Sequence, residues 1–458
     1  MNLNEPIAAI STPYGRGGIA VIRLSGEGVL PLADRFFLPA KGVKLCDLEG
    51  NTTVYGHIFH NGAEIDDGIA AVFRAPHSFT GEDTVEISCH GGIVLANAVL
   101  ESAISSGCRY AGAGEFTKRA FLNGKLSLSQ AEAVMGLIDA VSEEGLKLSS
   151  AQARGVLSSK IDAFRSRLTD IIASVYAYID YPDEDLADMT ADELSRNISL
   201  LLKDMKVLLG TYRIGRAVCE GIVTAIAGKP NTGKSSVLNR ILGKERAIVT
   251  GIAGTTRDTV EETVNIGKIT LRLCDTAGIR GTDDMIEKMG VERSRKLLCD
   301  AELILAVFDS SQAFDGEDYE FIETLKETKA EIIPILNKSD LPTEADVSLI
   351  HSIGKPICLS AVTGEGFDKL YEKISELFIS EKIDYNTTPV IANARQYAAL
   401  SAACEHIETA EKALASGFTQ DVAGLDLEQA LQRLADFDGR AASSEITDCI
   451  FSRFCVGK

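Results

Sequence analysis

Hydrophobic positions along the chain recur with different spacings in successive regions. Up to about residue 118, short runs of β-branched residues alternate with Gly and Pro. The runs at 19–24, 54–59 and 84–88 predict strands, and the Gly-rich stretches at 15–18 and 90–92 predict turns. These patterns together are typical of an α+β domain.

From residue 217 to about 380, strand patterns alternate with helix patterns. Strands are expected at 221–227, 269–274, 302–308, 331–336 and 356–359. Such regular alternation indicates a parallel sheet built from βα units.

Helical spacing dominates the two stretches that flank this α/β region. In the first, Ser127 and Gln130 match a capping box, and Pro182 ends the helical pattern. Between them, apolar residues follow each other at alternating steps of four and three, which predicts a long helix packed along another helix. This seam consists of Leu157, Ile161, Phe164, Leu168, Ile171, Val175 and Tyr178.

The second helical stretch runs from about 393 to 450. Neither stretch is a good candidate for a domain of its own. We therefore expect the two to pack together, with the α/β region inserted between them. Two separate small helical domains are the alternative.

Composition narrows the class of protein. A length of 458 residues favours two to four domains, and the ten cysteines contain no C-x-x-C pair, which indicates reduced thiols. A net charge of -20 argues against nonspecific coating of nucleic acid, although a local basic patch could still bind RNA. Neither a signal peptide nor a bilayer-spanning apolar run is evident, so we expect a cytoplasmic protein that does not contact membranes.

A phosphate-binding motif follows the strand expected at 221–227. The segment Gly228-Lys-Pro-Asn-Thr-Gly-Lys-Ser235 fits G-x-x-x-x-G-K-[ST] between a strand and a helix. Its glycines let backbone amides surround the phosphates. Lys234 supplies positive charge to the outer phosphates, and the Ser235 hydroxyl can bind Mg²⁺.

Three further motifs follow later strands, at the edge where α/β sheets place their ligands. In Asp275-Thr-Ala-Gly278, the carboxylate can hold the Mg²⁺ shell and the last amide can sense the γ-phosphate. In Asn337-Lys-Ser-Asp340, the final carboxylate can accept the N1 and N2 protons of guanine, which adenine does not offer. Ser360-Ala-Val362 can complete the base pocket.

These motifs resemble those of the Ras-like GTPase superfamily, with one departure. Ile279 stands where Ras-type enzymes carry the glutamine that orients the attacking water. Isoleucine cannot hydrogen-bond water. Either the domain only binds GTP, or another residue or another ion acts in its place.

Segments spread over essentially the whole chain resemble the MnmE (TrmE) family of bacterial tRNA-modification GTPases. The chain ends in Cys-Val-Gly-Lys, where the family usually has Ile in place of Val456. The other segments are Ala9-Ile-Ser-Thr-Pro-Tyr-Gly-Arg-Gly-Gly18, Phe79-Thr-Gly-Glu-Asp83, Gly114-Glu-Phe-Thr-Lys-Arg-Ala-Phe-Leu-Asn-Gly-Lys125 and Ile248-Val-Thr-Gly-Ile-Ala-Gly-Thr-Thr-Arg-Asp258.

The resemblance implies a domain organisation. Residues 1–118 would form an α+β domain for tetrahydrofolate binding and dimerisation. Residues 119–216 and 384–458 would form one all-α domain that is split in sequence. Residues 217–383 would form an inserted Ras-like P-loop G domain with a doubly wound sheet.

The resemblance also implies an activity. Family members are potassium-dependent GTPases that act as homodimers with the FAD-containing flavoprotein MnmG (GidA). They add an aminomethyl or carboxymethylaminomethyl group at carbon 5 of the wobble uridine of certain tRNAs. The one-carbon donor is 5-formyl- or methylene-tetrahydrofolate.

Residue roles carry over from the family onto matching positions. Glu287 would orient the attacking water, and Lys234 would assist at the phosphates. Cys455 would be either a nucleophile or a structural residue. The K⁺ ligands would be Asn231, Thr250, Ile252 and Thr255, the Mg²⁺ ligands Ser235 and Thr256, and the folate ligands Arg23, Glu86, Lys125 and Lys458. The GTP contacts would be Asn231, Thr232, Gly233, Lys234, Ser235, Ser236, Thr250, Thr255, Thr256, Asp275, Thr276, Ala277, Gly278, Asn337, Lys338, Asp340, Ser360, Ala361 and Val362.

Two other functions compete. The G motifs alone permit a ribosome-assembly GTPase of the Era or Der type, which acts as an RNA-binding switch. Such proteins carry a KH-like domain after the G domain, whereas 384–458 has a helical pattern. A membrane-remodelling, dynamin-like GTPase is the third hypothesis, but no basic amphipathic segment is evident.

Overall fold

The computed structural model describes residues 5–180, 191–244, 262–267, 269–274, 298, 301–378, 383–416, 420–439, 447, 450–452, 454 and 456–457. Two compact units divide the chain. The first contains Met1–Met135, Ala153–Leu201 and Ala402–Lys458, and the second contains Gly136–Gln152 and Leu202–Ser401. Each unit is built from segments far apart in the sequence.

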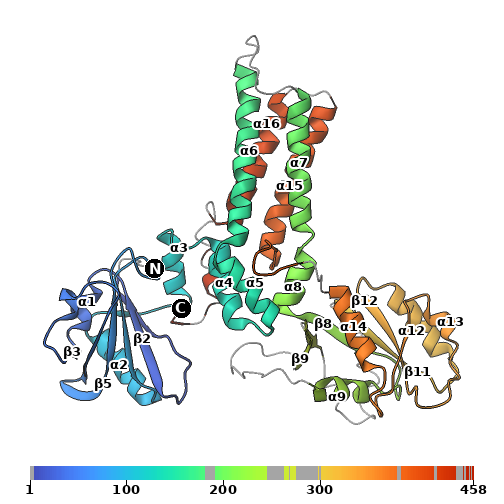
Figure 1. The fold of residues 1–458 in the computed structure, drawn as a ribbon, viewed down its shortest axis with the longest axis horizontal. Helices are drawn as coiled ribbons and strands as arrows, with labels where there is room; N and C mark the ends of the chain where they lie inside the picture. Colours follow the sequence, from blue (N-terminus) through green and yellow to red (C-terminus); the bar gives the residue numbers. More distant parts are fainter. Residues whose placement is uncertain are drawn as a thin grey trace. The chain divides into compact units, whose positions relative to one another are not determined.

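A seven-stranded sheet organises the N-terminal part of the first unit (Figure 1). Its strands lie in the order β3-β4-β5-β6-β2-β1-β7, and all neighbours are antiparallel except β1 and β7. The strands are β1 (Ile7–Ile10), β2 (Ile19–Ser25), β3 (Phe37–Pro39), β4 (Thr52–His60), β5 (Ala63–Phe73), β6 (Thr84–His90) and β7 (Arg109–Tyr110). The strands expected at 19–24, 54–59 and 84–88 are thus confirmed as β2, β4 and β6.

The two faces of this sheet differ. Helices α1 (Val29–Ala33) and α2 (Ile93–Ser105) cover one face, where Ile22, Ile58 and Ile87 are fully buried. On the other face, Tyr55, Ile69 and Ser88 lie side by side across β4, β5 and β6. Tyr55 and Ile69 are about half exposed there, and of the described elements helix α3 (Glu115–Leu122) covers the β1 end of this face.

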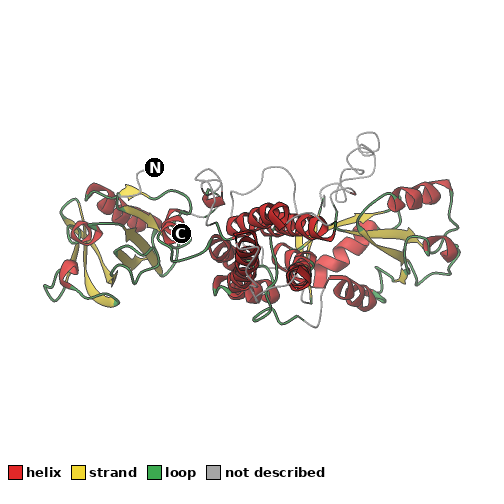
Figure 2. Ribbon diagram, turned by 90° about the horizontal axis from the view of Figure 1, so that it is seen from above, coloured by secondary structure: helices red, strands yellow, loops and turns green. Residues whose placement is uncertain are grey.

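The long helix expected from the heptad seam is present. Helix α6 (Val156–Asp180) buries Leu157, Ile161, Phe164, Leu168 and Val175 almost completely. It packs along α16 (Gln420–Phe437), and both helices are labelled in Figure 1. Tyr176 on α6 donates a hydrogen bond of 2.8 Å to Glu428 on α16. Figure 2 shows the helices of the chain in red, seen from above. The two sequence-distant helical stretches therefore pack together, as expected.

Helix α4 (Leu128–Asp139) begins where the sequence indicates. It starts with the expected capping box, in which the Gln130 amide donates to the Ser127 hydroxyl and the Ser127 amide donates to the Gln130 side chain. The remaining helices are α5 (Glu143–Ala153), α7 (Ala191–Leu209), α8 (Tyr212–Glu220), α15 (Ala394–Ala415) and the short η1 (Leu45–Asp47). Pro182, expected to end α6, lies outside the described residues.

A six-stranded sheet forms the core of the second unit, in the order β13-β12-β11-β8-β10-β9. All neighbouring strands are parallel except β9 and β10, which form an antiparallel pair. The strands are β8 (Ile222–Ala227), β9 (Glu262–Ile266), β10 (Ile269–Leu273), β11 (Leu303–Asp309), β12 (Glu331–Asn337) and β13 (Ile357–Cys358). The five expected strands are confirmed as β8, β10, β11, β12 and β13, and they pair in parallel as expected. Strand β9 was not predicted and adds an antiparallel edge.

Helices α9 (Lys234–Lys244), α12 (Gly316–Lys326), α13 (Val347–Ile350) and α14 (Phe367–Phe378) accompany this sheet. They contribute to two separate apolar clusters: Val237 and Phe367 pack in one, and Ile322 and Ile350 in the other. The architecture is that of a doubly wound, Ras-like G domain. Among the described residues, no helix is long and apolar enough to cross a membrane.

Candidate functional site

The phosphate-binding motif forms the turn between β8 and α9. Gly228 and Gly233 both have positive φ, 154° and 91°. A Cβ on Gly228 would lie 2.2 Å from the carbonyl oxygen of Val307, and one on Gly233 would lie 2.2 Å from Nδ2 of Asn337. Only glycine fits at these two positions, so the backbone curls tightly in front of the α9 N-terminus.

Inside this loop, the carbonyl oxygen of Lys229 is a shared acceptor. The Lys234 ammonium donates to it at 2.6 Å, and the Thr232 hydroxyl donates to it at 3.0 Å. Lys234 therefore already stands at the mouth of the loop, where a β- or γ-phosphate would attract its charge. Asn231, Ser235 and Ser236 are exposed around it.

Asn337 joins three of the four nucleotide motifs. It is almost fully buried, its Nδ2 donates to the Thr232 carbonyl at 2.9 Å, and its Oδ1 accepts from the Ala361 amide at 3.0 Å. One side chain thus connects the phosphate loop, the end of β12 and the loop after β13. A charge-neutral amide suits this place because it can donate and accept at once.

The loop after β13 forms the side of the site where we expect the base. Ser360 is fully buried and its hydroxyl accepts from the Thr363 amide at 3.2 Å, while Val362 is 78% exposed. Arg240 on α9 donates to the Thr363 carbonyl at 3.0 Å, which holds this loop from the phosphate side. Asp340 is exposed beyond the end of β12, free to meet a base edge. The sequence did not point to Arg240, because an arginine in a helix is normally a solvated side chain.

The described part of the chain therefore brings together Asn231, Thr232, Gly233, Lys234, Ser235, Ser236, Asn337, Lys338, Asp340, Ser360, Ala361 and Val362 in one G domain. Other expected site residues lie outside the described residues. These are Thr250, Ile252, Thr255, Thr256, Asp275, Thr276, Ala277, Gly278, Glu287, Cys455 and Lys458.

Oxygen-rich residues at the loop fit hard cations in part. The exposed Ser235 hydroxyl lies at the start of α9, and the exposed Asn231 has a left-handed backbone with a φ of 62°. Hydroxyl and amide oxygens are suitable ligands for Mg²⁺ and K⁺.

Three of the expected folate residues, Arg23, Glu86 and Lys125, lie near the loop at 75–81 in the N-terminal domain. Arg23 and Glu86 are opposite each other on β2 and β6, and the guanidinium donates to Glu86 Oε1 at 2.8 Å. The same guanidinium lies 5.7 Å from the ring centre of Phe79, which is 39% exposed. Lys125 donates to the Pro76 carbonyl at 2.9 Å. A carboxylate, two cations and an exposed ring fit a flat heterocycle with an acidic tail.

The end of the chain returns to this domain. Val456 forms an antiparallel bridge with Ala113, and the Ser11 hydroxyl donates to the Gly457 carbonyl at 3.0 Å. Phe454 and Phe451 pack against Leu128 and Ala131 of α4. The C-terminal motif is therefore anchored beside two of the segments that carried the family resemblance.

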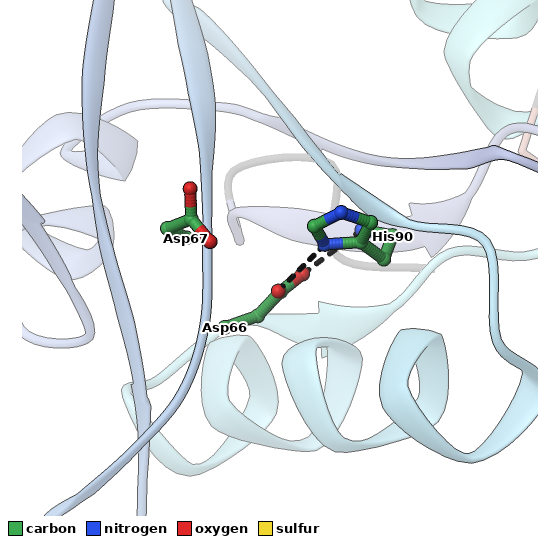
Figure 3. A group of neighbouring side chains, drawn as sticks. All are labelled: Asp66, Asp67 and His90. Carbon is green, nitrogen blue, oxygen red and sulfur yellow. Dashed lines mark hydrogen bonds and ion pairs between the residues drawn. The ribbon is translucent and has the colours of Figure 1, made fainter.

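One histidine of the N-terminal domain lies beside two acidic side chains, Asp66 and Asp67. His90 donates through its backbone amide and pairs through Nδ1 with the two oxygens of Asp66, at 2.9 and 2.8 Å (Figure 3). Asp67 is the third member of a group whose atoms could reach one metal ion, but it accepts a hydrogen bond of 2.8 Å from Tyr55. Since both carboxylates already have protein partners, we interpret this group as a structural ion pair.

Comparisons with known proteins cover the whole chain. A family model for the MnmE helical domain matches residues 128–455, and one for the GTP-binding protein TrmE N-terminus matches residues 6–125. The tRNA modification GTPase MnmE of Clostridioides difficile (strain 630) is 42% identical, with 100% of both chains covered. That of Levilactobacillus brevis is also 42% identical, with 99% of this chain and 98% of the relative covered.

Among solved structures, the G domain of the T. maritima FeoB iron transporter is 28% identical. The match covers 34% of this chain and 97% of that one, with a TM-score of 0.26. No conclusion about the fold rests on this likeness.

Proposed function

The chain belongs to the MnmE family of tRNA modification GTPases and is a GTP hydrolase, and from this premise we propose what it modifies and with which partners. It would act with the flavoprotein MnmG (GidA), which carries FAD, on the wobble uridine of certain tRNAs. The product would carry an aminomethyl or carboxymethylaminomethyl group at carbon 5. The one-carbon unit would come from 5-formyl- or methylene-tetrahydrofolate.

Asn337 is the observation that best supports guanine-nucleotide chemistry in the described residues. Its two hydrogen bonds set the distance between the phosphate loop and the base loop. Asp340 follows three residues later, so a base bound between these loops meets its carboxylate. That carboxylate would accept hydrogen bonds from N1 and N2 of guanine. Adenine offers no such pair of donors and would leave the carboxylate without partners, which gives the selectivity.

For hydrolysis, we propose that Lys234 leaves the Lys229 carbonyl and turns to the outer phosphates as GTP binds. Glu287 would orient the attacking water in place of the missing glutamine. Ser235 and Thr256 would hold Mg²⁺. Asn231, Thr250, Ile252 and Thr255 would hold K⁺, whose charge supplies the transition-state stabilisation that an arginine finger supplies elsewhere.

For the one-carbon donor, we propose that Glu86 accepts from the donor edge of the pterin. Arg23, Lys125 and Lys458 would bind the acidic tail. The exposed Phe79 ring next to Arg23 supports this assignment, because a flat heterocycle can stack there. Cys455 would stand near this donor, as a nucleophile or as part of the tail.

We further propose that the chain works as a homodimer in the cytoplasm. The open sheet face supports self-association, because Tyr55 and Ile69 are neighbours there and each is about half exposed. Light scattering should give twice the chain mass for the wild type. The exchange Ile69→Glu should give monomers, and an unchanged mass would remove this face from the proposal.

The decisive experiment is nucleoside analysis of tRNA from cells that lack the gene. Carbon-5-modified wobble uridines should disappear and return with the wild-type gene. Asp340→Asn should fail to restore them, because its amide nitrogen opposes the guanine N2 protons. In purified form that variant should instead hydrolyse XTP, since xanthine carries an oxygen at this position.

An unchanged nucleoside profile in the deleted strain would overturn the modification role and favour the ribosome-assembly alternative. The potassium proposal is tested separately, by hydrolysis rates in KCl and NaCl at matched ionic strength. Equal rates would remove K⁺ from the mechanism. The folate proposal is tested by measuring tetrahydrofolate binding to a Glu86→Gln variant, with the GTPase activity of the same variant as the control.

A further inference from the structure

An aspartate in no recognised motif contacts the base motif of the G domain. Asp309 is the last residue of β11, and its carboxylate oxygen Oδ2 accepts a hydrogen bond of 2.6 Å from the ammonium of Lys338. The register of β11 and β12 explains this contact, because Asp309 is directly opposite Asn337. Lys338 is the next residue.

The carboxylate is itself held in one position. Its other oxygen, Oδ1, accepts from the backbone amide of Ser311 at 3.0 Å and from the hydroxyl of Ser311 at 2.7 Å. Only 11% of the Asp309 side chain is exposed. Burial alone would raise its pKa, but the hydrogen bonds from Lys338 and Ser311 hold that pKa below its ordinary value. The group is therefore a fixed negative charge.

Lys338 needs such a partner. It has a left-handed backbone with a φ of 66°, which is uncommon for a residue with a long side chain. Only 31% of its side chain is exposed, between the buried Asn337 and the exposed Asp340. A lysine side chain has four rotatable bonds. Fixing its ammonium group removes most of the conformational freedom of the side chain before a ligand binds.

We propose that Asp309 is a positioning residue of the guanine-nucleotide site. By binding the ammonium group of Lys338, Asp309 holds the aliphatic part of that side chain in place as a surface on which the purine ring packs. Asp309 itself does not touch the nucleotide. The lysine stem is apolar and covers flat apolar surface well once its charged end is satisfied. This inference rests on guanine-nucleotide binding by the G domain and is independent of the tRNA modification.

The proposal makes a distinctive kinetic prediction. The base is the same in GTP, in the transition state and in GDP, so a poorly held lysine stem weakens binding of all three alike. Losing such uniform binding raises KM and leaves kcat unchanged. A general loss of folding would lower the fraction of active protein and hence the apparent kcat.

The chain offers a closely matched control. Asp346, at the start of α13, accepts from the Ser348 amide at 3.0 Å and from the Ser348 hydroxyl at 2.6 Å. It has the same aspartate–serine geometry as Asp309, in the same unit, without a lysine in the described contacts. The exchanges Asp309→Asn and Asp346→Asn therefore remove the same charge from an aspartate that accepts from the serine two residues later.

The experiment measures binding of fluorescently labelled GDP and the kinetics of GTP hydrolysis with the full chain and Mg²⁺. Asp309→Asn should weaken GDP binding about tenfold, the size expected for one charge-assisted hydrogen bond, and raise KM similarly at constant kcat. Asp346→Asn should match the wild type. In a double-mutant cycle, Asp309→Asn should have no further effect once Lys338→Met is present.

The outcomes are distinct. If the wild type binds no GDP, the GTPase function fails together with this inference. If the wild type binds GDP and Asp309→Asn binds it equally well, only the inference fails. An equal loss in the Lys338→Met background also overturns it, because Asp309 would then act through some other group.

Discussion

Replacing Arg119 with methionine should destabilise the N-terminal domain far more than any exchange of a surface arginine. Arg119 on α3 is 2% exposed and is the largest fully buried side chain among the described residues. One terminal nitrogen, Nη1, donates to Glu82 at 3.1 Å. The other, Nη2, donates to the Glu5 carbonyl at 2.8 Å and to Glu115 at 3.0 Å. These contacts connect the β5–β6 loop, the start of the chain and α3.

The size of the effect follows from what remains after the exchange. Removing one partner of a buried ion pair costs about 3–5 kcal/mol, because the other charge is left unpaired. Glu115 would keep Arg109 at 2.6 Å and the Gly112 amide at 2.8 Å, and Glu82 is 21% exposed and would keep Ser25. We therefore expect the lower end of that range, about 3 kcal/mol.

Hydrogen–deuterium exchange of the full chain can measure this loss regionally, which matters because a chain of several domains does not unfold in two states. Amides of β2, β6 and α3 should exchange roughly 100-fold faster in the Arg119→Met variant. Arg165→Met is the control, since its pair with Asp162 is partly exposed, is 3.4 Å long and is worth at most about 0.5 kcal/mol. Equal protection in both variants would show that the buried network does not stabilise this domain.

Three further predictions concern other parts of the molecule. Asn337→Ala removes both links between the phosphate loop and the base loop, so GDP affinity should fall at least about tenfold, and unchanged binding would contradict the role given to this residue. Phe164→Ala opens a cavity between α6 and its neighbours and should cost about 3–5 kcal/mol in local exchange measurements on α6, whereas a loss below about 1 kcal/mol would mean that this seam is not closely packed. The hydrogen bond to Asp66 and then its charge raise the pKa of His90 above 6.5. The stabilisation from this pair is therefore present below pH 6.5 and is lost as the pH rises through the folded-state pKa of His90. In an NMR titration, Asp66→Asn should return the pKa of His90 to about 6.5. If the pKa of His90 is the same in the variant as in the wild type, Asp66 is not the cause of the shift.

Much of the fold could be predicted because its periodicities are local. The seam of α6 and the strands on both sides of the phosphate loop follow patterns set by residues near in sequence. The missed strands are instructive. Strand β5 contains Asp66, Asp67 and Gly68 in succession, which breaks the alternation of apolar and polar residues. Strand β9 is a five-residue edge strand beside β10, and only Val264 and Ile266 mark its buried face, so its alternation is too short to predict a strand by itself.

The candidate site was predictable where a motif carries its own chemistry, and not where a residue acts through its neighbours. Lys234 and Asp340 could be assigned because phosphate and guanine require such groups at such places. Arg240 and Asp309 could not, because their roles depend on contacts with Thr363 and Lys338 across the fold. Sequence spacing contains no information about such contacts.

Some residues in the segments that carried the family resemblance have a structural role in the folded domain. Glu82 belongs to one of them, and Glu115 and Arg119 belong to another, yet all three serve the buried ion-pair network. A residue in a motif shared by a family can thus stabilise the fold without binding the ligand of that family. For these residues, loss of stability and loss of folate binding must be measured separately before either is taken as a role.

The contact between Ser11 and Gly457 constrains the order in which parts of the protein can fold. Ser11 and Gly457 are 446 residues apart in sequence, yet they share a hydrogen bond in the same unit. The entropic cost of closing a loop grows only with the logarithm of its length, so the inserted G domain adds little to it. The contact can nevertheless form only once Gly457 has been made. Because Gly457 follows the G domain in sequence, the N-terminal domain receives this segment only after the G domain has been synthesised.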